Sequence, residues 1–452
     1  MTRPAADESS LVTTRQGALS GWGRHPVVSA HQISSEDLGS LTRHAPLTRG
    51  LGRAYGDAAL PSPEDRWVAC SARADRILAF DPGSGWLTAE AGLSLGEIYR
   101  LLLPRGFFTP VSPGTRFVTL GGMVASDVHG KNHHCEGCIG AHIGRLRIRL
   151  ADDSVVTCSP TEHPDLFRAT IGGMGLTGHI LEVSVRLERV PSPWIYQESE
   201  RISDLDTLCG RLKEAGARWP MTVAWADCLA SGTRFGRGTL LLGRWADSSN
   251  APARFPRLAR PMPVPLTLPD RMLAPVFIRA LNALKFHAHR PRHQQGTVRP
   301  ESFFYPLDIV GEWHRLYGPR GFIQYQCVLP AWAGVGAPRR FLEFTRRIGV
   351  GAFLCVIKDC GPEGIGLLSF PTAGMTIAID FPVRSNTQAV VDRLNDWVIK
   401  EGGRVYLAKD AVTRADHFRA MEPRLDTFLQ ARRAWDPLGR IRSAQSVRLF
   451  GW

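Results

Sequence analysis

Residues 113–134 read PGTRFVTLGGMVASDVHGKNHH, and the interpretation of the whole chain starts from this stretch. Its first half places glycines at positions 114, 121 and 122, where the backbone can approach a ligand closely and its N–H groups can form an anion-binding concavity. Its second half adds His129, Lys131, His133 and His134. An isolated Gly-Gly pair is typical of an ordinary turn, but glycines followed by four basic side chains predict a cofactor cradle beside a reaction site.

Two further glycine-rich segments flank this stretch. Upstream, residues 48–60 read TRGLGRAYGDAAL, a tight loop after a short strand, and its backbone N–H groups and arginines can wrap a pyrophosphate. Downstream, residues 172–178 read GGMGLTG, between an expected helix and a long strand. The spacing is not GxGxxG and no long strand precedes a long helix, so a Rossmann fold is disfavoured. The sequence therefore predicts one α+β domain over residues 19–190.

The remainder of the chain predicts a second, strand-rich domain over residues 191–400. Strands are expected within 223–245, 321–330, 353–361 and 374–382, from alternating apolar residues. The Pro-, Arg- and His-rich segment 250–300 predicts a mobile surface loop that could contact a lipid-like substrate or a membrane surface. Residues 401–452 are expected to return to the first domain through a helix at 421–437 and a strand at 440–452. Residues 1–18 predict a disordered lead.

Composition sets the class of protein. The chain has 452 residues, too many for one hydrophobic core, and a formal charge of +13 that favours anionic partners. No RNA- or DNA-binding motif accompanies the charge, so nucleic acid is not expected. The nine cysteines form no disulfide framework, and the CxxC at 135–138 lacks a second half, so no metal site is expected. We expect a cytoplasmic protein, with possible membrane contact, because no apolar signal core or membrane span is apparent.

Polar residues in the second domain mark a candidate substrate site. Gln324 and Gln326 share one face of an expected strand, where two amides suit sugar hydroxyls or, alternatively, a solvated sheet face. Lys358 interrupts an apolar strand, and Lys409 follows the apolar run VYLA. Such lysines commonly extend to solvent, and Trp225 is a candidate for lining a pocket.

The order of RGLGRAYGD, PGTRFVTLGG, DVHGKNHH and GGMGLTG resembles the FAD-binding domain of the vanillyl-alcohol oxidase superfamily. HGKNHH together with YPLDIVGEWHRLYGPRGFIQYQ, residues 305–326, resembles the branch that oxidises the 2′-hydroxyl of polyprenylphosphoryl ribose. That reaction is the first half of an epimerisation to arabinose for cell walls. The resemblance implies an α+β, two-domain FAD-binding fold with an antiparallel-sheet substrate domain, and a short-chain NADH-dependent reductase as partner.

The resemblance also implies roles for particular residues. The expected FAD-binding residues are Arg49, Gly50, Leu51, Gly52, Arg53, Ala54, Tyr55, Gly56, Gly114, Thr119, Gly121, Gly122, Ser126, His129, Gly178, Ile180 and Tyr406. The expected substrate-binding residues are Lys131, Trp225, Tyr305, Gln324, Gln326, Lys358, Thr376, Ala378 and Lys409. Many relatives attach FAD through a histidine in the first glycine loop, where this chain reads Gly52-Arg53-Ala54, so dissociable FAD is expected.

The implied chemistry is removal of a hydroxyl proton by a base and of a carbon-bound hydride by the flavin. Lys409 and His129 are the candidates for the base and for stabilising the reduced flavin, and the sequence leaves open which residue does which. Mycobacterial members of the branch carry a cysteine at the position of Ala378 and an asparagine at that of Thr376. The pocket wall is therefore expected to differ.

Other functions remain open at this stage. A paralogue could oxidise a soluble glycoside or an aminoglycoside-type alcohol in secondary metabolism. An aldonolactone oxidase fits HGKNHH and the paired glutamines less well. A non-catalytic lipid- or phosphate-binding protein on a flavin-binding scaffold is the alternative outside enzymes.

Overall fold

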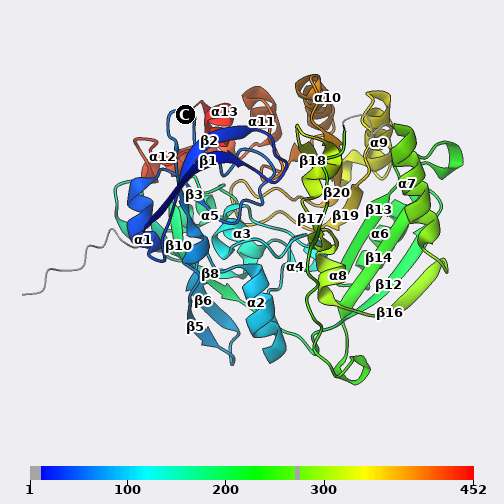
Figure 1. Cartoon of the computed structure of the whole chain (residues 1–452), viewed down its shortest axis with the longest axis horizontal. Coiled ribbons are helices and arrows are strands. Elements are labelled where there is room, and N and C mark those ends of the chain that lie inside the picture. Colours follow the sequence, from blue (N-terminus) through cyan, green and yellow to red (C-terminus); the bar gives the residue numbers. More distant parts are fainter. Residues whose placement is uncertain (1–11, 270–274, 452) are drawn as a thin grey trace, which may run out of the picture.

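The computed structural model describes residues 12–269 and 275–451, which form two lobes (Figure 1). Its mixture of helices with two large antiparallel sheets and a smaller mixed sheet confirms the predicted α+β class. We call the left lobe of Figure 1 the N-terminal lobe, and the large sheet of the right lobe the cap sheet. No helix of the described residues is long and apolar enough to cross a membrane.

The N-terminal lobe contains two main sheets. The first is four-stranded, in the order β1 (Thr13–Ser20), β2 (Val27–Ser34), β4 (Trp67–Cys70) and β3 (Thr48–Arg49). The second is antiparallel, in the order β5 (Ile77–Asp81), β6 (Trp86–Glu90), β10 (His179–Arg186), β8 (Ile143–Arg149) and β9 (Val155–Cys158). A short pair, β7 (Phe107–Phe108) with β11 (Glu188–Arg189), leads towards the cap.

Short helices pack on these sheets and place the loops. Ser94 caps α2 and Thr119 caps α3 through hydrogen bonds to backbone N–H groups of the first turn, as expected for hydroxyl N-caps. Leu95, Ile98 and Leu102 of α2 lie in the core beside the antiparallel sheet. The helices of this lobe are α1 (Leu38–Leu41), α2 (Leu95–Leu102), α3 (Leu120–Ala125), α4 (His133–Glu136) and α5 (Pro164–Thr170).

The cap sheet is antiparallel and eight-stranded. Its order is β16 (His293–Val298), β12 (Ile195–Ile202), β14 (Gly238–Trp245), β13 (Met221–Ala226), β19 (Cys355–Cys360), β20 (Gly374–Pro382), β18 (Phe322–Pro330) and β21 (Arg404–Val405). The expected hairpin at 223–245 corresponds to β13 and β14. A separate parallel pair joins β15 (Met262–Pro263) to β17 (Val310–Gly311).

Helices cover one face of the cap sheet and leave the other for the site. Because side chains alternate along a strand, Ala224, Ile357 and Cys327 enter the large core with α6 and α10. Trp225, Lys358 and Gln326 therefore point to the opposite face, towards the N-terminal lobe. The helices of this lobe are α6 (Leu205–Gly216), α7 (Pro275–Ala288), α8 (Pro300–Phe304), α9 (Ala337–Arg347) and α10 (Thr387–Lys400).

The C-terminal segment crosses back to the N-terminal lobe through α11 (Ala415–Met421), α12 (Leu425–Trp435) and α13 (Ala444–Phe450). The helix expected at 421–437 corresponds to α12. The strand expected at 440–452 is wrong, because residues 444–450 form α13. Ser443 and Ser446 make a reciprocal capping box at its start, and this local signal outweighs the alternating apolar pattern.

Two further expectations need correction. Residues 13–18 of the expected disordered lead lie in β1, an edge strand paired with β2 from Thr13↔Ser34 to Ser20↔Val27. Residues 1–11 lie outside the described ranges. The segment 250–300 contains α7 and also β16, which pairs with β12 and extends the cap sheet, so it is not a loop throughout. Residues 270–274 lie outside the described ranges. β1 and β16 are polar edge strands, without the apolar alternation on which the predictions rested.

Candidate active site

The candidate site lies where the open face of the cap sheet meets the loop that follows α3. Strand register places Gln326 opposite Ala378, and Lys358 opposite Thr376, across three neighbouring strands. His129 comes from the N-terminal lobe and reaches this row of side chains. The structure therefore brings together residues that the sequence separates by more than two hundred positions.

His129 is held by hydrogen bonds on both ring nitrogens. Lys358 Nζ lies 3.0 Å from Nδ1, and Gln326 Nε2 lies 3.2 Å from Nε2. The ring is buried, and burial followed by the charge of Lys358 lowers the pKa of His129 well below its usual value. His129 is therefore neutral at neutral pH and available to accept a proton.

Thr376 sets the orientation of Gln326. The Thr376 hydroxyl donates to the carbonyl of Cys327 at 2.9 Å, so it accepts from Gln326 Nε2 at 3.1 Å. The same amide nitrogen faces His129 Nε2. Strands β18 and β20 therefore hold the Gln326 amide against one side of the imidazole, while Lys358 contacts Nδ1 on the other side.

Three lysines converge on this region, and each is half-buried. Burial, and then the charge of Lys358, lowers the pKa of Lys131 to about 7. Burial also lowers the pKa of Lys409 to about 7, against a smaller opposing effect of Asp380, and the pKa of Lys358 to about 8. Within the described residues, none of the three forms an ion pair with a carboxylate. Such a cluster of amines gains stability when an anion binds.

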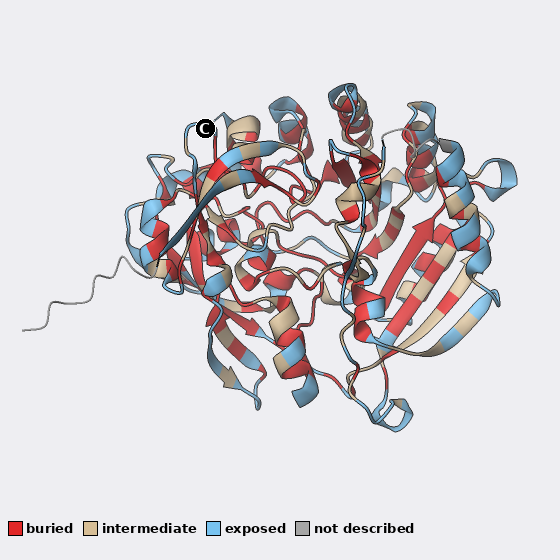
Figure 2. Ribbon diagram, viewed as in Figure 1, coloured by how far each residue is buried: buried red, intermediate tan, exposed pale blue. Residues whose placement is uncertain are grey.

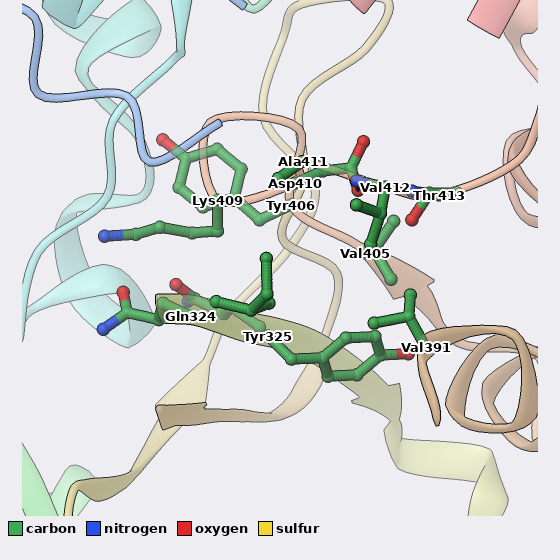
Figure 3. A pocket seen from close by; sticks show the side chains of 12 residues that line it. Gln324, Tyr325, Val391, Val405, Tyr406, Lys409, Asp410, Ala411, Val412 and Thr413 are labelled. Carbon is green, nitrogen blue, oxygen red and sulfur yellow. Dashed lines mark hydrogen bonds between the residues drawn. The ribbon is translucent and has the colours of Figure 1, made fainter. Parts of the chain in front are cut away.

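Lys409 occupies the side of the site nearest the first glycine loop. Its Nζ lies 3.8 Å from the centroid of the Tyr55 ring. Figure 3 shows the side chains of Lys409 and Gln324 pointing to the same side, away from Val391 and Thr413. The void lined by these residues holds only about 10 Å³, so it is not itself a ligand site.

A buried aspartate also belongs to the site, although the sequence analysis did not single it out. Asp380 accepts a hydrogen bond from Gln324 at 2.7 Å, and burial raises its pKa to about 6. It follows Thr376 and Ala378 at a spacing of two in an apolar strand, which is a signal that could have revealed it. His133 is a second omission from the site residues. It is buried, its Nδ1 accepts from Gly361 N at 3.0 Å, and its Nε2 has no partner among the described residues.

An aromatic wall closes the far side of His129. Phe370 stacks on Tyr406 at 4.8 Å between ring centroids, and both rings lie within 6 Å of the imidazole. The Tyr406 hydroxyl donates to the carbonyl of Ser126 at 2.9 Å. The wall therefore joins the C-terminal segment to the end of α3.

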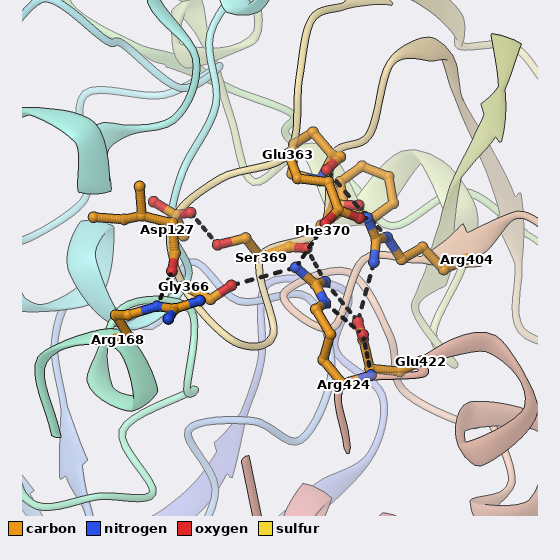
Figure 4. A network of polar contacts seen from close by, with 11 residues as sticks. Asp127, Arg168, Glu363, Gly366, Ser369, Phe370, Arg404, Glu422 and Arg424 are labelled. Carbon is orange, nitrogen blue, oxygen red and sulfur yellow. Dashed lines mark hydrogen bonds and ion pairs between the residues drawn. The ribbon is translucent and has the colours of Figure 1, made fainter. Parts of the chain in front are cut away.

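A polar network fixes this wall from behind (Figure 4). Asp127, two residues before His129, accepts from Gly140 N and from the Ser369 hydroxyl. Arg404 donates to the carbonyl of Phe370 at 2.8 Å, and Arg424 donates to that of Ser369 at 2.8 Å. These hydrogen bonds hold the loop 363–370 against the turn between α3 and α4 that carries His129.

The first glycine loop fits an anionic ligand. Within the described residues, the backbone N–H groups of residues 51–54 meet no acceptor, and Gly52 has a φ of 66°. Successive free N–H groups in a glycine turn form an anion-binding concavity. A cavity of about 330 Å³ opens beside the loop, lined in part by Leu51, Gly52 and Arg53.

Contacts around the first glycine loop show why glycine is needed at two positions and what its two arginines touch. A Cβ on Gly50 would collide with Thr119, and one on Gly56 with the carbonyl of Asp410. Arg53 packs over the Trp22 ring at 4.2 Å. Arg49 donates to the carbonyls of Ser20 and Ala59, so it supports the loop and its guanidinium is already engaged.

The other residues predicted to bind the cofactor or the substrate make contacts outside the immediate surroundings of His129. Tyr305 is buried and hydrogen-bonds Ser112 at 2.6 Å, next to the stretch 113–134. Lys131 Nζ donates to the carbonyl of Phe304 at 3.0 Å. Trp225 is opposite Val356, one strand further across the cap sheet. Gly178 packs on β8, Ile180 is buried in β10, and Gly114 has open space where a Cβ would be.

Metal ligation has no candidate in the part of the chain that is described, where no three His, Cys, Asp or Glu side chains cluster suitably. Cys135 is exposed and Cys138 buried, both as free thiols. The chemistry of the donor set is instead that of amines, amides, an imidazole and free backbone N–H groups. This set suits a phosphate-bearing cofactor and a phosphate-bearing substrate.

Comparison with known proteins agrees with this geometry. The FAD binding domain family matches residues 41–159. The decaprenylphosphoryl-β-D-ribose oxidase of Mycolicibacterium smegmatis is 35% identical over 452 residues, covering 95% of this chain and 97% of that protein. An uncharacterised protein encoded in the mprA 5′ region of Streptomyces coelicolor is 35% identical over 373 residues, covering 79% of this chain and 100% of that protein. The D-arabinono-1,4-lactone oxidase of Yarrowia lipolytica is 26% identical over 197 residues, 41% of this chain and 36% of that protein.

Proposed function

The chain belongs to the decaprenylphosphoryl-β-D-ribose oxidase family of FAD-dependent oxidoreductases acting on CH–OH groups, and we propose that it oxidises the 2′-hydroxyl of a polyprenylphosphoryl ribose to the ketone. This is the first half of an epimerisation of ribose to arabinose. The observation that carries the proposal is the set of three half-buried lysines, with no ion pair to a carboxylate among the described residues, around a neutral His129. Such a set binds a phosphodiester and places a proton acceptor beside the sugar.

FAD supplies the hydride acceptor when it is bound. The free N–H groups of residues 51–54 would hold its pyrophosphate, and Lys409 beside Tyr55 would place a positive charge near the reduced ring. The loop has Arg53 and Ala54 after Gly52, with no histidine for a covalent link, so we propose that FAD is dissociable.

Proton transfer is assigned to His129. It is neutral at neutral pH, and Lys358 and Gln326 hold its ring in a fixed orientation. Lys131 and Lys358 are placed to bind the substrate phosphate, while Gln324 and Gln326 offer amide groups to the sugar hydroxyls. Thr376 and Ala378 form the wall opposite Gln326 and Lys358.

Two relations to the cell follow from this substrate. A ketone intermediate needs a second enzyme to reduce it from the other face, so we propose a short-chain NADH-dependent reductase as partner. A polyprenyl chain resides in a membrane, so we propose a cytoplasmic protein that contacts the membrane surface.

Anaerobic bleaching of the flavin tests the function. Farnesylphosphoryl ribose should bleach the visible absorbance of the purified protein, whereas the 2′-deoxyribose analogue should not. If neither compound bleaches the flavin but a soluble glycoside does, the chain is instead a glycoside oxidase. Thr376 and Ala378 are the wall residues to examine in that case.

The mode of flavin attachment has a separate test. Acid precipitation should leave all of the flavin in the supernatant, because no residue of the first glycine loop is positioned as a covalent ligand of the histidine type. Flavin that remains with the precipitated protein would contradict dissociable binding.

A further inference from the structure

Helix α7 packs on the cap through a narrow inner stripe. Ile278 and Phe286 are buried, and between them Asn282 is fully buried and donates to Asp227 at 2.9 Å. Arg237 packs over the Phe286 ring at 4.6 Å. The inner stripe of α7 is therefore partly polar, with its hydrogen bond satisfied.

The outer side of the same helix exposes large apolar side chains beside basic ones. Val276 is 76% exposed, Phe277 is 42% exposed and Leu284 is 67% exposed. Much of the outward side of α7 is pale blue in Figure 2. A surface helix of a water-soluble domain normally exposes polar residues, so three exposed large apolar side chains on one short helix are unusual. Met262 and Leu266, in the segment leading to α7, are each 73% exposed as well.

Positive charge accompanies these apolar side chains. Residues 251–300 contain nine Lys and Arg residues and one Asp, in a chain whose formal charge is +13. Arg254, Arg257, Arg260 and Arg279 are all exposed. In the described ranges, none of these four forms an ion pair, although many arginines elsewhere in the chain do. Exposed apolar groups interleaved with unpaired arginines match the interface of an anionic bilayer.

The helix adjoins the candidate active site. Lys285 Nζ lies 4.2 Å from the centroid of the Trp225 ring. Trp225 is opposite Val356 on β19, and Val356 is on the same face of that strand as Lys358. Helix α7 therefore borders the face of the cap sheet that carries the lysines proposed to bind the substrate phosphate.

We propose that α7 and the preceding segment 254–268 form the surface by which this protein docks on an anionic lipid bilayer, with Val276, Phe277 and Leu284 entering the interface and the arginines contacting lipid phosphates. The inference rests on the proposed function for its purpose, because a prenyl chain anchored in the bilayer must present its ribose phosphate to the site. The docking itself depends only on the surface described here.

Vesicle sedimentation tests the proposal. The FAD-bound protein should sediment with phosphatidylglycerol vesicles and not with phosphatidylcholine vesicles, and raising the salt to about 0.5 M should weaken the binding. The double variant Phe277→Ser, Leu284→Ser should bind about tenfold more weakly or worse, because two apolar groups no longer enter the interface. Arg279→Glu should also bind more weakly.

Matched controls separate docking from general surface effects. Leu438 is 72% exposed elsewhere in the chain, and Arg43 is an exposed arginine on the N-terminal lobe. Leu438→Ser and Arg43→Glu should leave vesicle binding unchanged. Circular dichroism should be unchanged for every variant, because all five positions are exposed.

The outcomes distinguish the two proposals. Flavin bleaching by farnesylphosphoryl ribose in solution should be the same for the wild type and for Phe277→Ser, Leu284→Ser, since neither residue lies in the site. Bleaching without vesicle binding would overturn the docking surface alone. Vesicle binding without bleaching would overturn the proposed substrate alone. Equal vesicle binding by the double variant and the wild type would also overturn the docking surface. The exposed face of α7 would then have another occupant, such as a protein.

Discussion

At the scale of single residues, the site depends on a chain of hydrogen bonds that ends at His129. The Cys327 carbonyl orients Thr376, Thr376 orients Gln326, and Gln326 meets the imidazole on the side opposite Lys358. The Thr376 hydroxyl donates to one partner and accepts from the other, so the Gln326 amide is held in one orientation beside the ring. The orientation of His129, the proposed base, is therefore influenced by strands on which it does not itself lie.

Replacing His129 tests its proposed role in proton transfer. His129→Gln should reduce the rate of flavin reduction by about 10²–10⁴-fold, which is the usual contribution of a positioned base. The protein should keep its flavin, because the glycine loop is unchanged. His163 is exposed, and His163→Gln should have no effect on the rate. A His129→Gln rate near that of the wild type would exclude the imidazole as the base.

Replacing Thr376 tests the hydrogen-bond chain. Thr376→Val should cost about 1 kcal/mol of unfolding free energy, because Gln326 and the Cys327 carbonyl each lose a partner. It should also slow flavin reduction, whereas Thr376→Ser should preserve both properties. Thr222 is a buried threonine on the same sheet whose hydroxyl has no partner among the described residues. Thr222→Val should therefore cost little, and equal costs at the two positions would contradict the account.

The lysines predict how activity depends on pH. In the free enzyme the pKa of Lys409 and of Lys131 is lowered to about 7, and each must be protonated to stabilise negative charge. The value of kcat/KM should therefore fall as the pH rises above about 7. In Lys409→Arg the guanidinium stays charged, so the Lys409 contribution to this fall should disappear. A kcat/KM that rises from pH 7 to pH 9 in the wild type would contradict these roles.

At the scale of elements, α13 holds the glycine loop against the turn that carries Lys409. Arg448 donates to Asp57 at 2.8 and 2.9 Å and to Asp410 at 2.8 Å, and both aspartates are buried. Tyr55 N also donates to the carbonyl of Ala408 at 2.9 Å. Helix α13 therefore fixes two loops that face the site, one from the N-terminal lobe and one from the C-terminal segment.

Removing this arginine should weaken both the fold and flavin binding. Arg448→Met leaves two buried carboxylates without their partner, which typically costs about 3–5 kcal/mol. The variant should unfold at lower urea concentration and lose FAD on dialysis. Arg433→Met, at an exposed position of α12, serves as the control. An Arg448→Met protein as stable as the control would show that α13 does not support the glycine loop.

Elements with strong local patterns were predictable from the sequence, and those governed by pairing were not. Strand β20 alternates apolar residues with Thr376 and Ala378, and its bounds match the expected 374–382. Strands β1 and β16 have no such alternation. They form because their backbones pair with strands β2 and β12. Helix α13 was missed because RIRSAQSVRLF reads as a strand unless the Ser443 capping box is weighed first.

The candidate site was predictable to a similar degree. His129, Gln326 and Lys358 were singled out and do meet in space. The roles of Thr376 and Asp380 depend on strand register, which fixes what lies opposite Gln326 and Gln324, and one chain's sequence does not show register. Arg49 was expected to bind the cofactor, and this stays a prediction; its Nη1 and Nη2 each donate to a nearby carbonyl, a contact that the sequence does not show.

At the scale of the whole molecule, the site exists only where the two lobes meet. His129 and the glycine loops belong to the N-terminal lobe, while Lys358 and Gln326 belong to the cap sheet, and the C-terminal segment adds Lys409. Folding therefore brings several amines into a buried space before any anion arrives. Bringing these amines together lowers the unfolding free energy, and the same positive charge makes the site suitable for an anion.

This cost predicts how stability depends on pH. The pKa of Lys131 and Lys409 is lowered from 10.5 to about 7, and that of Lys358 to about 8. Between these values and 10.5 the unfolded chain binds more protons than the folded protein, so the unfolding free energy should rise with pH across that window. The rise is at most about 1.4 kcal/mol per pH unit for each group.

Urea unfolding at about pH 7 and pH 9 measures the effect. Lys131→Met should show a smaller gain in stability with pH than the wild type, while Lys400→Met, at an exposed position, should match the wild type. If the unfolding free energy depends on pH equally in Lys131→Met and the wild type, burial does not lower the pKa of Lys131. The unfolding free energy should thus rise with pH while kcat/KM falls, because substrate binding needs the charged amines that folding disfavours.

The position of oxidation on the sugar tests the central claim most directly. Stopped-flow bleaching of the flavin would be compared for farnesylphosphoryl ribose carrying deuterium at C2′ and for the same compound carrying it at C3′. The proposed reaction predicts slower bleaching with the C2′ label alone and a 2′-ketone as the product. Slower bleaching with the C3′ label, or with neither label and no ketone, would contradict oxidation of the 2′-hydroxyl by this site.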